Sequence, residues 1–234
     1  SVGLSGAASM TRAAREARKY SELRDAFGLK IGRFPMVEAQ LNNMENFAQR
    51  TTAGAFKLYR DFLGLKGGLG GGITTDEPES MKKKRFDVRE LIMLQKITAS
   101  WDTVDILRMA MSIFGGHGVM EDFSSLPRLY RDAAVNELWE GPRNVLLAQI
   151  HRDLQRVSEW YPPSEFVKNI LLGADKKIVA GFSDEISDLV SYPDLVEMNE
   201  ETVRICQQWD NFCAGLSHAY QDLAKSEVEG GKDV

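Results

Sequence analysis

The sequence has little of what usually identifies a protein class. It contains two cysteines, Cys206 and Cys213, too few for a disulfide framework, so a reducing compartment is expected. No run approaches 18 apolar residues, and the sequence therefore predicts no membrane-spanning helix. CxxC, HExxH, P-loop and GxSxG motifs are absent, and the three histidines are scattered, with His151 and His218 expected at the surface. No metal site is predicted.

An excess of positive charge is also missing. Lys and Arg number 29 against 34 Asp and Glu, a net charge of −5, which disfavours binding to nucleic acid through bulk charge. A composition of 43% hydrophobic and 27% charged residues is that of a globular protein and excludes a disordered tail or a collagen-like fibre. The one compact basic run, Lys82 to Arg85, is expected to be a solvated loop end, with a phosphate or nucleic-acid contact as the less favoured alternative.

What is present is helical periodicity. Apolar residues spaced by three and four predict long helices over residues 37–62 and 94–114. A stripe of small residues predicts a helix over 13–27, and a fourth helix is expected over 145–154. No segment alternates polar and apolar residues as a strand does. These patterns predict an all-α protein built on an up-and-down four-helix bundle.

The rest of the chain consists of a glycine-rich segment and a helical C-terminal region. The glycine-rich segment 66–80 is expected to be a mobile loop between helices. Further helical stretches are predicted over 166–178 and 206–223, the second one behind an Asn199 cap. We therefore expect a helical bundle domain over residues 1–158 and a helical C-terminal extension over 159–234.

Two segments depart from ordinary helical sequence. Three glycines, Gly115, Gly116 and Gly118, follow a long helix that ends near Phe114, which suggests a close approach to the backbone. Glu140 lies between Trp139 and a Gly-Pro pair, at the start of a new helix. A carboxylate held at such a break in apolar surroundings is a candidate general base with a raised pKa. An acidic residue ahead of a helix N-terminus is equally expected for structural reasons.

Four motifs in register across residues 1–155 resemble the C-terminal domain of acyl-CoA dehydrogenases. They are Tyr20-x-x-x-Arg24-x-x-Phe27-Gly28, Gly115-Gly-x-Gly118, Tyr130-Arg-Asp-Ala133 and Trp139-Glu-Gly141. The resemblance implies an FAD-dependent α,β-dehydrogenation of an acyl-CoA thioester, in which a glutamate removes the α-proton and the β-hydrogen leaves as hydride to FAD. It also implies a homodimer or homotetramer, with electron-transfer flavoprotein as the electron acceptor.

The same resemblance assigns roles to individual residues. Glu140 matches the position of the catalytic base in many members. Arg24 matches an arginine that contacts the FAD of a neighbouring subunit, and Phe27 matches its aromatic companion. A guanidinium suits a pyrophosphate.

Four more positions match cofactor contacts of the family. Ser112, Gly115 and Gly116 match the helix end that approaches the adenosine and pyrophosphate of FAD, and Asn144 matches a polar position that also reaches FAD. This sequence departs from the family pattern at Ser112, where many members have Gln. Pro142 stands where members often have Thr, and Pro35 follows Phe34 where Gln is common.

Two alternatives remain open at this point. The motif combination is closest to the branch that contains bacterial alkylation-response flavoproteins, some of which dehydrogenate poorly or bind DNA. A scaffold role in oligomerisation is the other alternative. The family's N-terminal helical domain and middle β-domain are not found in this sequence, so the 234 residues alone are expected to be inactive and the intact protein to be the flavoenzyme. The resemblance implies cytoplasm for a bacterial protein and mitochondrial matrix for a eukaryotic one.

Overall fold

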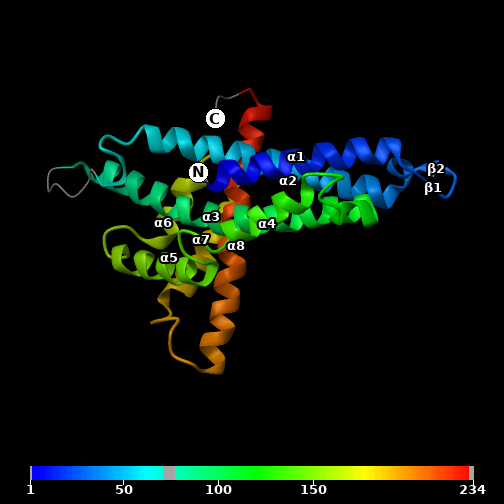
Figure 1. Ribbon diagram of the computed structural model, residues 1–234. Coiled ribbons are helices and arrows are strands. Elements are labelled where there is room, and N and C mark those ends of the chain that lie inside the picture. Colours follow the sequence, from blue (N-terminus) through cyan, green and yellow to red (C-terminus); the bar gives the residue numbers. More distant parts are fainter. Residues whose placement is uncertain (1, 71–76, 232–234) are drawn as a thin grey trace.

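The structure is a computed structural model that describes residues 2–70 and 77–231. Eight α-helices account for most of these residues (Figure 1). They are α1 (Val2–Leu23), α2 (Pro35–Leu63), α3 (Glu79–Phe114), α4 (Leu126–Asn136), α5 (Arg143–Val157), α6 (Pro163–Ile170), α7 (Lys176–Ser191) and α8 (Glu200–Glu229). A hairpin of two-residue strands, β1 (Asp25–Ala26) and β2 (Leu29–Lys30), and the 3₁₀ turns η1 (Ile31–Arg33), η2 (Gly68–Gly70) and η3 (Gly115–Val119) complete the described elements.

Local sequence explains where several helices begin. Pro35 and Pro163 open α2 and α6 at the first helical position, where a missing backbone N–H costs nothing. Asn199 caps α8, because its Oδ1 accepts a hydrogen bond of 2.8 Å from the backbone N–H of Thr202. The predicted Asn199 cap is therefore confirmed.

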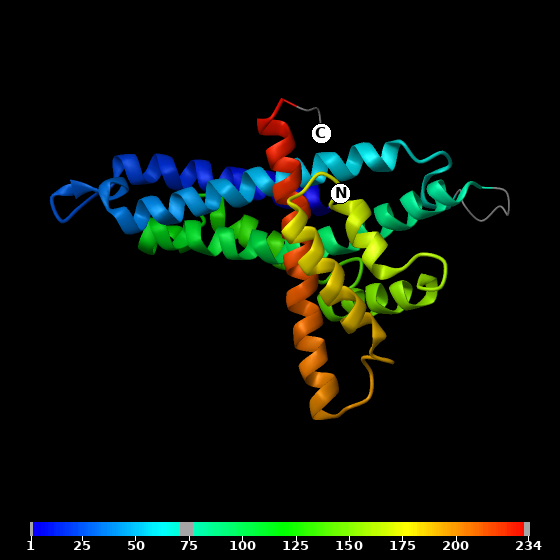
Figure 2. The same ribbon diagram turned by 180° about the vertical axis from the view of Figure 1, so that it is seen from behind.

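Helices α1, α2 and α3 lie side by side, and α4 packs against α1 and α3 to complete a bundle (Figures 1 and 2). Its core, which we call the bundle cluster, includes Met10, Leu41, Met44, Leu107 and Leu126, none of which exposes any surface. Small residues on α1 let the neighbouring helices approach closely. The all-α class and the helical bundle are confirmed.

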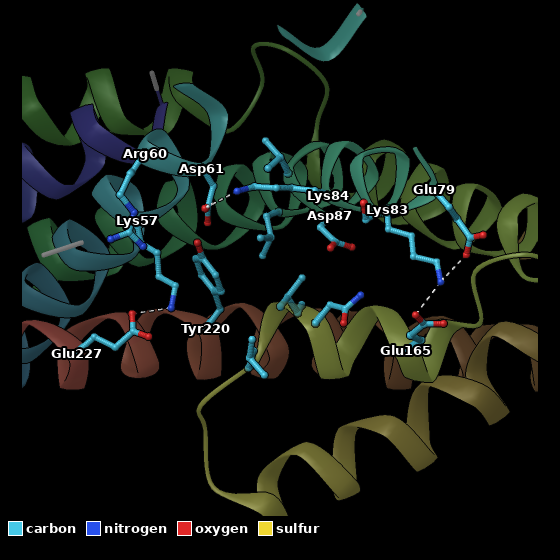
Figure 3. Close-up of a pocket in the computed structure, with 16 residues that line it drawn as sticks. Lys57, Arg60, Asp61, Glu79, Lys83, Lys84, Asp87, Glu165, Tyr220 and Glu227 are labelled. Carbon is cyan, nitrogen blue, oxygen red and sulfur yellow. Dashed lines mark hydrogen bonds and ion pairs between the residues drawn. The ribbon is translucent and has the colours of Figure 1, made fainter. Parts of the chain in front are cut away.

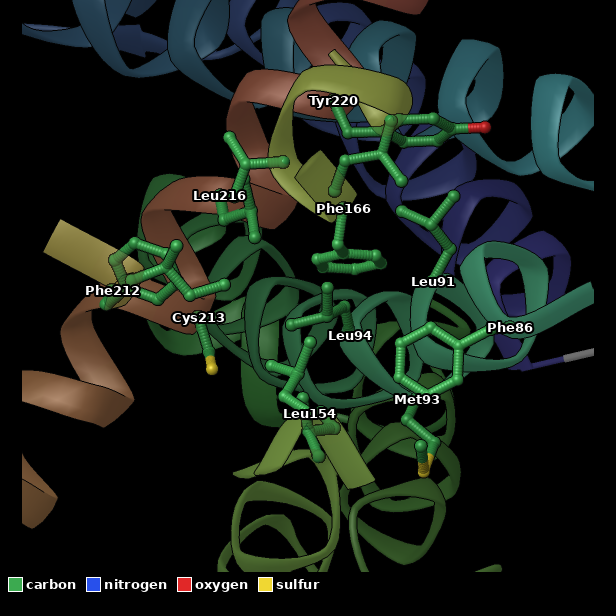
Figure 4. Close-up of a cluster of buried hydrophobic side chains, with 14 of the residues drawn as sticks. Phe86, Leu91, Met93, Leu94, Leu154, Phe166, Phe212, Cys213, Leu216 and Tyr220 are labelled. Carbon is green, nitrogen blue, oxygen red and sulfur yellow. The ribbon is translucent and has the colours of Figure 1, made fainter. Parts of the chain in front are cut away.

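A second hydrophobic cluster joins the N-terminal half of α3 to α5, α6, α7 and α8, and we call it the extension cluster (Figure 4). Trp209, Phe166 and Tyr161 are its largest fully buried side chains. Helix α8 crosses α2 and α3 and carries the extension cluster along its length (Figures 1 and 2). The 36-residue helix α3 therefore belongs to both clusters.

The structure corrects several predicted boundaries. Helix α1 ends at Leu23, and Phe27 and Gly28 form the tip of the hairpin with φ of 52° and 82° instead of ending the helix. Helix α3 begins at Glu79, so the basic run lies in its first turns. Within the predicted glycine loop, residues 71–76 lie outside the described part, and residues 68–70 form η2. The stretch 166–178 is two helices, because Gly173 breaks it with φ of 100°.

The packing also differs in detail from the prediction. The fourth helix of the bundle is α4, whereas α5 packs against α3 nearer the extension and contacts α7 and α8. His151 is buried, not at the surface, and its Nε2 lies 3.1 Å from the carbonyl oxygen of Leu189. His218 is half-buried, and its Nε2 lies 2.8 Å from a carboxylate oxygen of Asp102. Over residues 2–70 and 77–231, no helix is both long and apolar enough to cross a bilayer.

Candidate functional site

Glu140 lies in the turn that joins α4 to α5. Its backbone adopts φ of 58°, a left-handed conformation that is uncommon for a residue with a side chain, and Gly141 follows with φ of 100°. Pro142 then leads into the first turn of α5. The chain therefore reverses at Glu140 over three residues whose conformation is not the ordinary helical one.

A buried lysine from α3 holds this turn. The Nζ of Lys96 donates hydrogen bonds to the carbonyl oxygens of Glu137, at 2.9 Å, and Gly141, at 2.6 Å. Its side chain is 95% buried. Burial lowers the pKa of Lys96, while the negative charges of Glu140 and Glu137 act in the opposite direction. Burial is also the main cause of the raised pKa of the Glu137 carboxyl.

An arginine holds the other side of the same turn. Arg143 donates from Nη1 to the carbonyl oxygen of Ile97 at 3.1 Å and from Nε to Asp210 on α8 at 2.8 Å. Its guanidinium lies 4.4 Å from the ring centroid of Trp101. The loop between α4 and α5 is thus tied to α3 at two points and to α8 at one.

Glu140 borders a cavity of about 210 Å³ between α1, α2 and α3. Apolar side chains form most of its wall: Val2, Leu4, Ala55, Leu58, Tyr59, Phe62 and Ile92. Lys96 and Gln95 supply polar groups, and the Nε2 of Gln95 is buried without a hydrogen-bond partner among the described residues. The Glu140 side chain itself is exposed. An accessible carboxylate at the rim of an apolar cavity can accept a proton from a ligand held there.

The opposite end of the bundle carries the predicted FAD contacts of the hairpin and of η3. Arg24 is exposed beside the hairpin, and Phe27 at its tip is 97% exposed. Tyr20 connects this end to η3, because its hydroxyl lies 3.0 Å from Nδ1 of His117 and its ring stacks on Phe114 at 4.2 Å. The last turn of α1, which leads into the hairpin, therefore lies beside η3.

The three glycines of η3 have different structural reasons. Gly115 needs its φ of 60° to end α3. A Cβ at Gly118 would clash with the carbonyl oxygen of Met111, so the chain's own backbone requires that glycine. Gly116 has neither constraint. Around both Gly115 and Gly116 the space is open, with nothing within 4 Å of an added Cβ.

The predicted site residues therefore form separate groups. Along α3, Lys96 and Gly115 are about 28 Å apart at 1.5 Å per residue. Ser112, in the last turn of α3, is exposed and lines a cavity of about 520 Å³ of its own. Asn144 is exposed at the start of α5 and lines a cavity of about 840 Å³ with Arg89 and Arg152. Neither residue lines the cavity of Glu140.

A further cavity of about 680 Å³ lies between α2, α3, α6 and α8 (Figure 3). Charged side chains pair across it. Asp87 accepts a hydrogen bond of 2.6 Å from the Tyr161 hydroxyl. Burial raises the pKa of Asp87 to about 7, against the effect of that hydrogen bond.

The basic run borders this cavity and is paired within the chain. Lys83 lies 2.8 Å from Glu165 and 2.9 Å from Glu79, and Lys84 lies 3.5 Å from Asp61 (Figure 3). Arg85 pairs with Glu77. The prediction of a solvated loop end was therefore wrong. These side chains neutralise acidic residues of α2, α6 and the segment before α3.

Sequence reasoning missed Lys96 and Arg143. One signal for Lys96 exists: six of the other eight residues from Leu91 to Ala99 are apolar, which is typical of a largely buried segment. A lysine in such a segment requires polar partners. For Arg143 no comparable signal exists, since its partners come from α3 and α8. Within residues 2–70 and 77–231, no group of three or more His, Cys, Asp or Glu side chains is arranged to hold a metal ion.

Comparison with known proteins identifies relatives. The family profile "Acyl-CoA dehydrogenase, C-terminal domain" matches residues 76–155. "Acyl-CoA dehydrogenase family member 11" of Caenorhabditis elegans is 32% identical over 143 residues, 61% of this chain and 21% of the relative. "Putative acyl-CoA dehydrogenase AidB" of Escherichia coli K12 is 28% identical over 160 residues, 66% of this chain and 26% of the relative.

Solved structures share the fold. An acyl-CoA dehydrogenase from Bacillus anthracis complexed with FAD superposes with a TM-score of 0.64 at 18% identity, over 97% of this chain and 41% of that one. The superposition includes nearly all of α6, α7 and α8, so the helices after α5 belong to the shared architecture. The chain spans about a fifth to a quarter of the length of the two curated relatives.

Proposed function

The chain belongs to the acyl-CoA dehydrogenase family, whose helical C-terminal domain it carries, and we propose that Glu140 is the proton-abstracting base of an FAD-dependent acyl-CoA dehydrogenase. The observation that supports this role most strongly is the position of Glu140 on a fixed turn at the rim of an apolar cavity. A carboxylate held there suits removal of a weakly acidic proton from an acyl chain that enters the cavity.

The proton moves from the α-carbon of the thioester to a carboxylate oxygen of Glu140. FAD, when bound, supplies the electron acceptor for the β-hydrogen and its electron pair. Lys96 and Arg143 hold the turn during this step through the backbone carbonyls of residues 137 and 141 and of Ile97. The apolar wall of the cavity keeps water from the reacting carbons.

The residues at the hairpin end suit a nucleotide cofactor. Arg24 offers an exposed guanidinium, a good partner for a pyrophosphate, and Phe27 offers an exposed ring. Open space around Gly115 and Gly116 leaves their backbone accessible. We propose that Arg24 and Phe27 contact the FAD of a neighbouring subunit. Ser112, Gly115 and Gly116 are proposed to approach the adenosine and pyrophosphate of FAD, and Asn144 is proposed to reach FAD from the start of α5.

The activity is proposed for the protein that combines this chain with the flavin-facing domains of the family. The described residues contain only a hairpin of two-residue strands, which is too little to form the wall of a flavin ring. The 234 residues alone are therefore proposed to be inactive. Electron-transfer flavoprotein is the proposed acceptor, and a dimer or tetramer the proposed assembly.

Glu140→Gln in the flavin-bearing protein tests this proposal. Anaerobic mixing with acyl-CoA, followed by the absorbance of bound FAD, is expected to show reduction slowed by roughly 10²–10⁴-fold, since a general base contributes about that factor. Glu159→Gln, at an exposed position after α5, is the matched control and should reduce FAD at the rate of the unmodified protein. Equal rates for Glu140→Gln and the control would remove Glu140 from the mechanism.

Binding to duplex DNA has less support. The compact basic run is paired with acidic residues of the same chain, and the net charge is −5. A DNA-binding protein of the alkylation-response type would be retained on immobilised duplex DNA at low salt and released as the salt concentration rises.

A further inference from the structure

We propose that Lys96 is a positioning residue for Glu140: by binding the carbonyl oxygens on both sides of it, Lys96 fixes the turn from which the carboxylate meets the substrate. This inference rests on the proposed function, because it concerns the residue assigned there as the base. Lys96 itself is not proposed to touch the reacting atoms.

The geometry of the turn carries the argument. The two carbonyl oxygens bound by Lys96, those of residues 137 and 141, lie three residues before Glu140 and one residue after it. A single ammonium group therefore joins the end of α4 to the start of α5 and closes the turn between them. The carbonyls at the end of a helix have no partner within that helix, so an external donor is required when they are buried.

The conformation of Glu140 explains why such a clamp is needed. In a glutamate with φ of 58°, the Cβ makes an unfavourable steric contact with the backbone. This conformation persists only where surrounding contacts enforce it. Without Lys96, the turn could relax to an ordinary negative φ. That relaxation would swing the carboxylate away from the rim of the cavity.

The burial of Lys96 argues for the same role. Placing a lysine where the residue keeps only 5% of its surface exposed is costly, and exposed positions for a lysine are abundant on α3. Lys96 lines the same cavity of about 210 Å³ as Glu140. Lys57 is a suitable comparison: it is 92% buried, but it pairs with the Glu227 carboxylate at 2.6 Å and does not bind the turn.

Hydrogen exchange of the 234-residue chain tests the clamp without any cofactor. Lys96→Met keeps the length of the side chain and removes both hydrogen bonds. The amides of residues 137–141, 143 and 144 are expected to exchange at least about tenfold faster, since hydrogen bonds to a charged group are each worth that factor or more. Lys57→Met should leave exchange in this segment unchanged. Exchange in 137–144 that is equal in Lys96→Met and Lys57→Met would overturn the inference.

Lys96→Arg covers the case in which Lys96→Met does not fold. It keeps the buried charge but displaces the donors, and it is expected to accelerate exchange in the same segment by a smaller factor. Unchanged exchange in a folded Lys96→Arg together with unchanged turnover would count against the clamp.

Kinetics of the flavin-bearing protein then separate positioning from general stability. Lys96→Met is expected to lower kcat by roughly tenfold to a hundredfold with KM for acyl-CoA within about twofold, because a misplaced base affects the chemical step. A rise in KM for acyl-CoA of about tenfold to a hundredfold with kcat unchanged would contradict the positioning role. Glu140→Gln is measured alongside: if it reduces FAD normally, the proposed function fails whatever Lys96 does. If Glu140→Gln is inactive while Lys96→Met keeps its kcat, only the positioning role fails.

Discussion

Replacing Glu90 with Met should stabilise the protein at neutral and alkaline pH. Glu90 is fully buried on α3, and neither of its carboxylate oxygens has a hydrogen-bond partner among the described residues. The guanidinium of Arg89 lies 3.7 Å from the Glu90 carboxyl group but binds Asp153 more closely, at 2.8 Å. Burial, followed by the charge of Asp153, raises the pKa of Glu90 to about 9, from 4.5.

The sign of the effect follows from linkage. In the unfolded chain the carboxyl loses its proton near pH 4.5, whereas in the folded protein it keeps the proton up to about pH 9. The folded state therefore binds more protons over this range, and the free energy of unfolding falls as pH rises from about 4.5 to about 9. One pKa unit corresponds to about 1.36 kcal/mol, so three pH units give an upper limit of about 4 kcal/mol.

Urea unfolding followed by circular dichroism at pH 5, 6.5 and 8 measures this difference. The free energy of unfolding of Glu90→Met relative to the unmodified protein should increase by about 2–4 kcal/mol between pH 5 and pH 8. Glu185→Met, which removes a carboxylate from an exposed position on α7, is the control. A difference between Glu90→Met and the unmodified protein that is the same at all three pH values would refute the reasoning.

Three further predictions concern stability. Gly118→Ala should lower the free energy of unfolding by about 1–3 kcal/mol, because its Cβ would meet the Met111 carbonyl oxygen, whereas Gly116→Ala should change it by less than about 0.5 kcal/mol; urea titration compares the two. Asn199→Ala should cost about 1 kcal/mol by the same assay, because the cap of α8 is lost. Burial lowers the pKa of His151, so the unfolded chain protonates first as pH falls below about 6.5; His151→Gln should lessen the loss of stability from pH 7 to pH 5 in urea titrations.

Helical periodicity predicted the long helices because each buries one continuous face. It could not predict where charged segments continue a helix. The basic run from Lys82 to Arg85 was predicted to be a loop end, yet it lies in the first turns of α3, where Lys83 pairs with Glu165 on α6 and Lys84 with Asp61 on α2. Those partners are far away in sequence. The hairpin after α1 was also missed, because strands of two residues are too short to show alternation.

The candidate site was likewise predicted only in part from the sequence. Motifs selected Glu140, Arg24 and Gly115, and the break in the chain at Glu140 was predicted from its Gly-Pro neighbours. What fixes that break depends on Lys96 and Arg143, whose partners are set by the packing of α3 and α8. Sequence alone also could not separate Gly118, required by the Met111 carbonyl, from Gly116, where the space is open.

Helix α3 is a member of both hydrophobic clusters and runs past Glu140 at one point and into η3 at its end. The length of α3 therefore sets the distance and the relative rotation between the two groups of candidate residues. Inserting or deleting one residue between Lys96 and Gly115 would shift one group by about 1.5 Å along the axis and rotate it by about 100° relative to the other. The length of this stretch therefore cannot change by a single residue without rotating one of the two groups away from its present face of the helix.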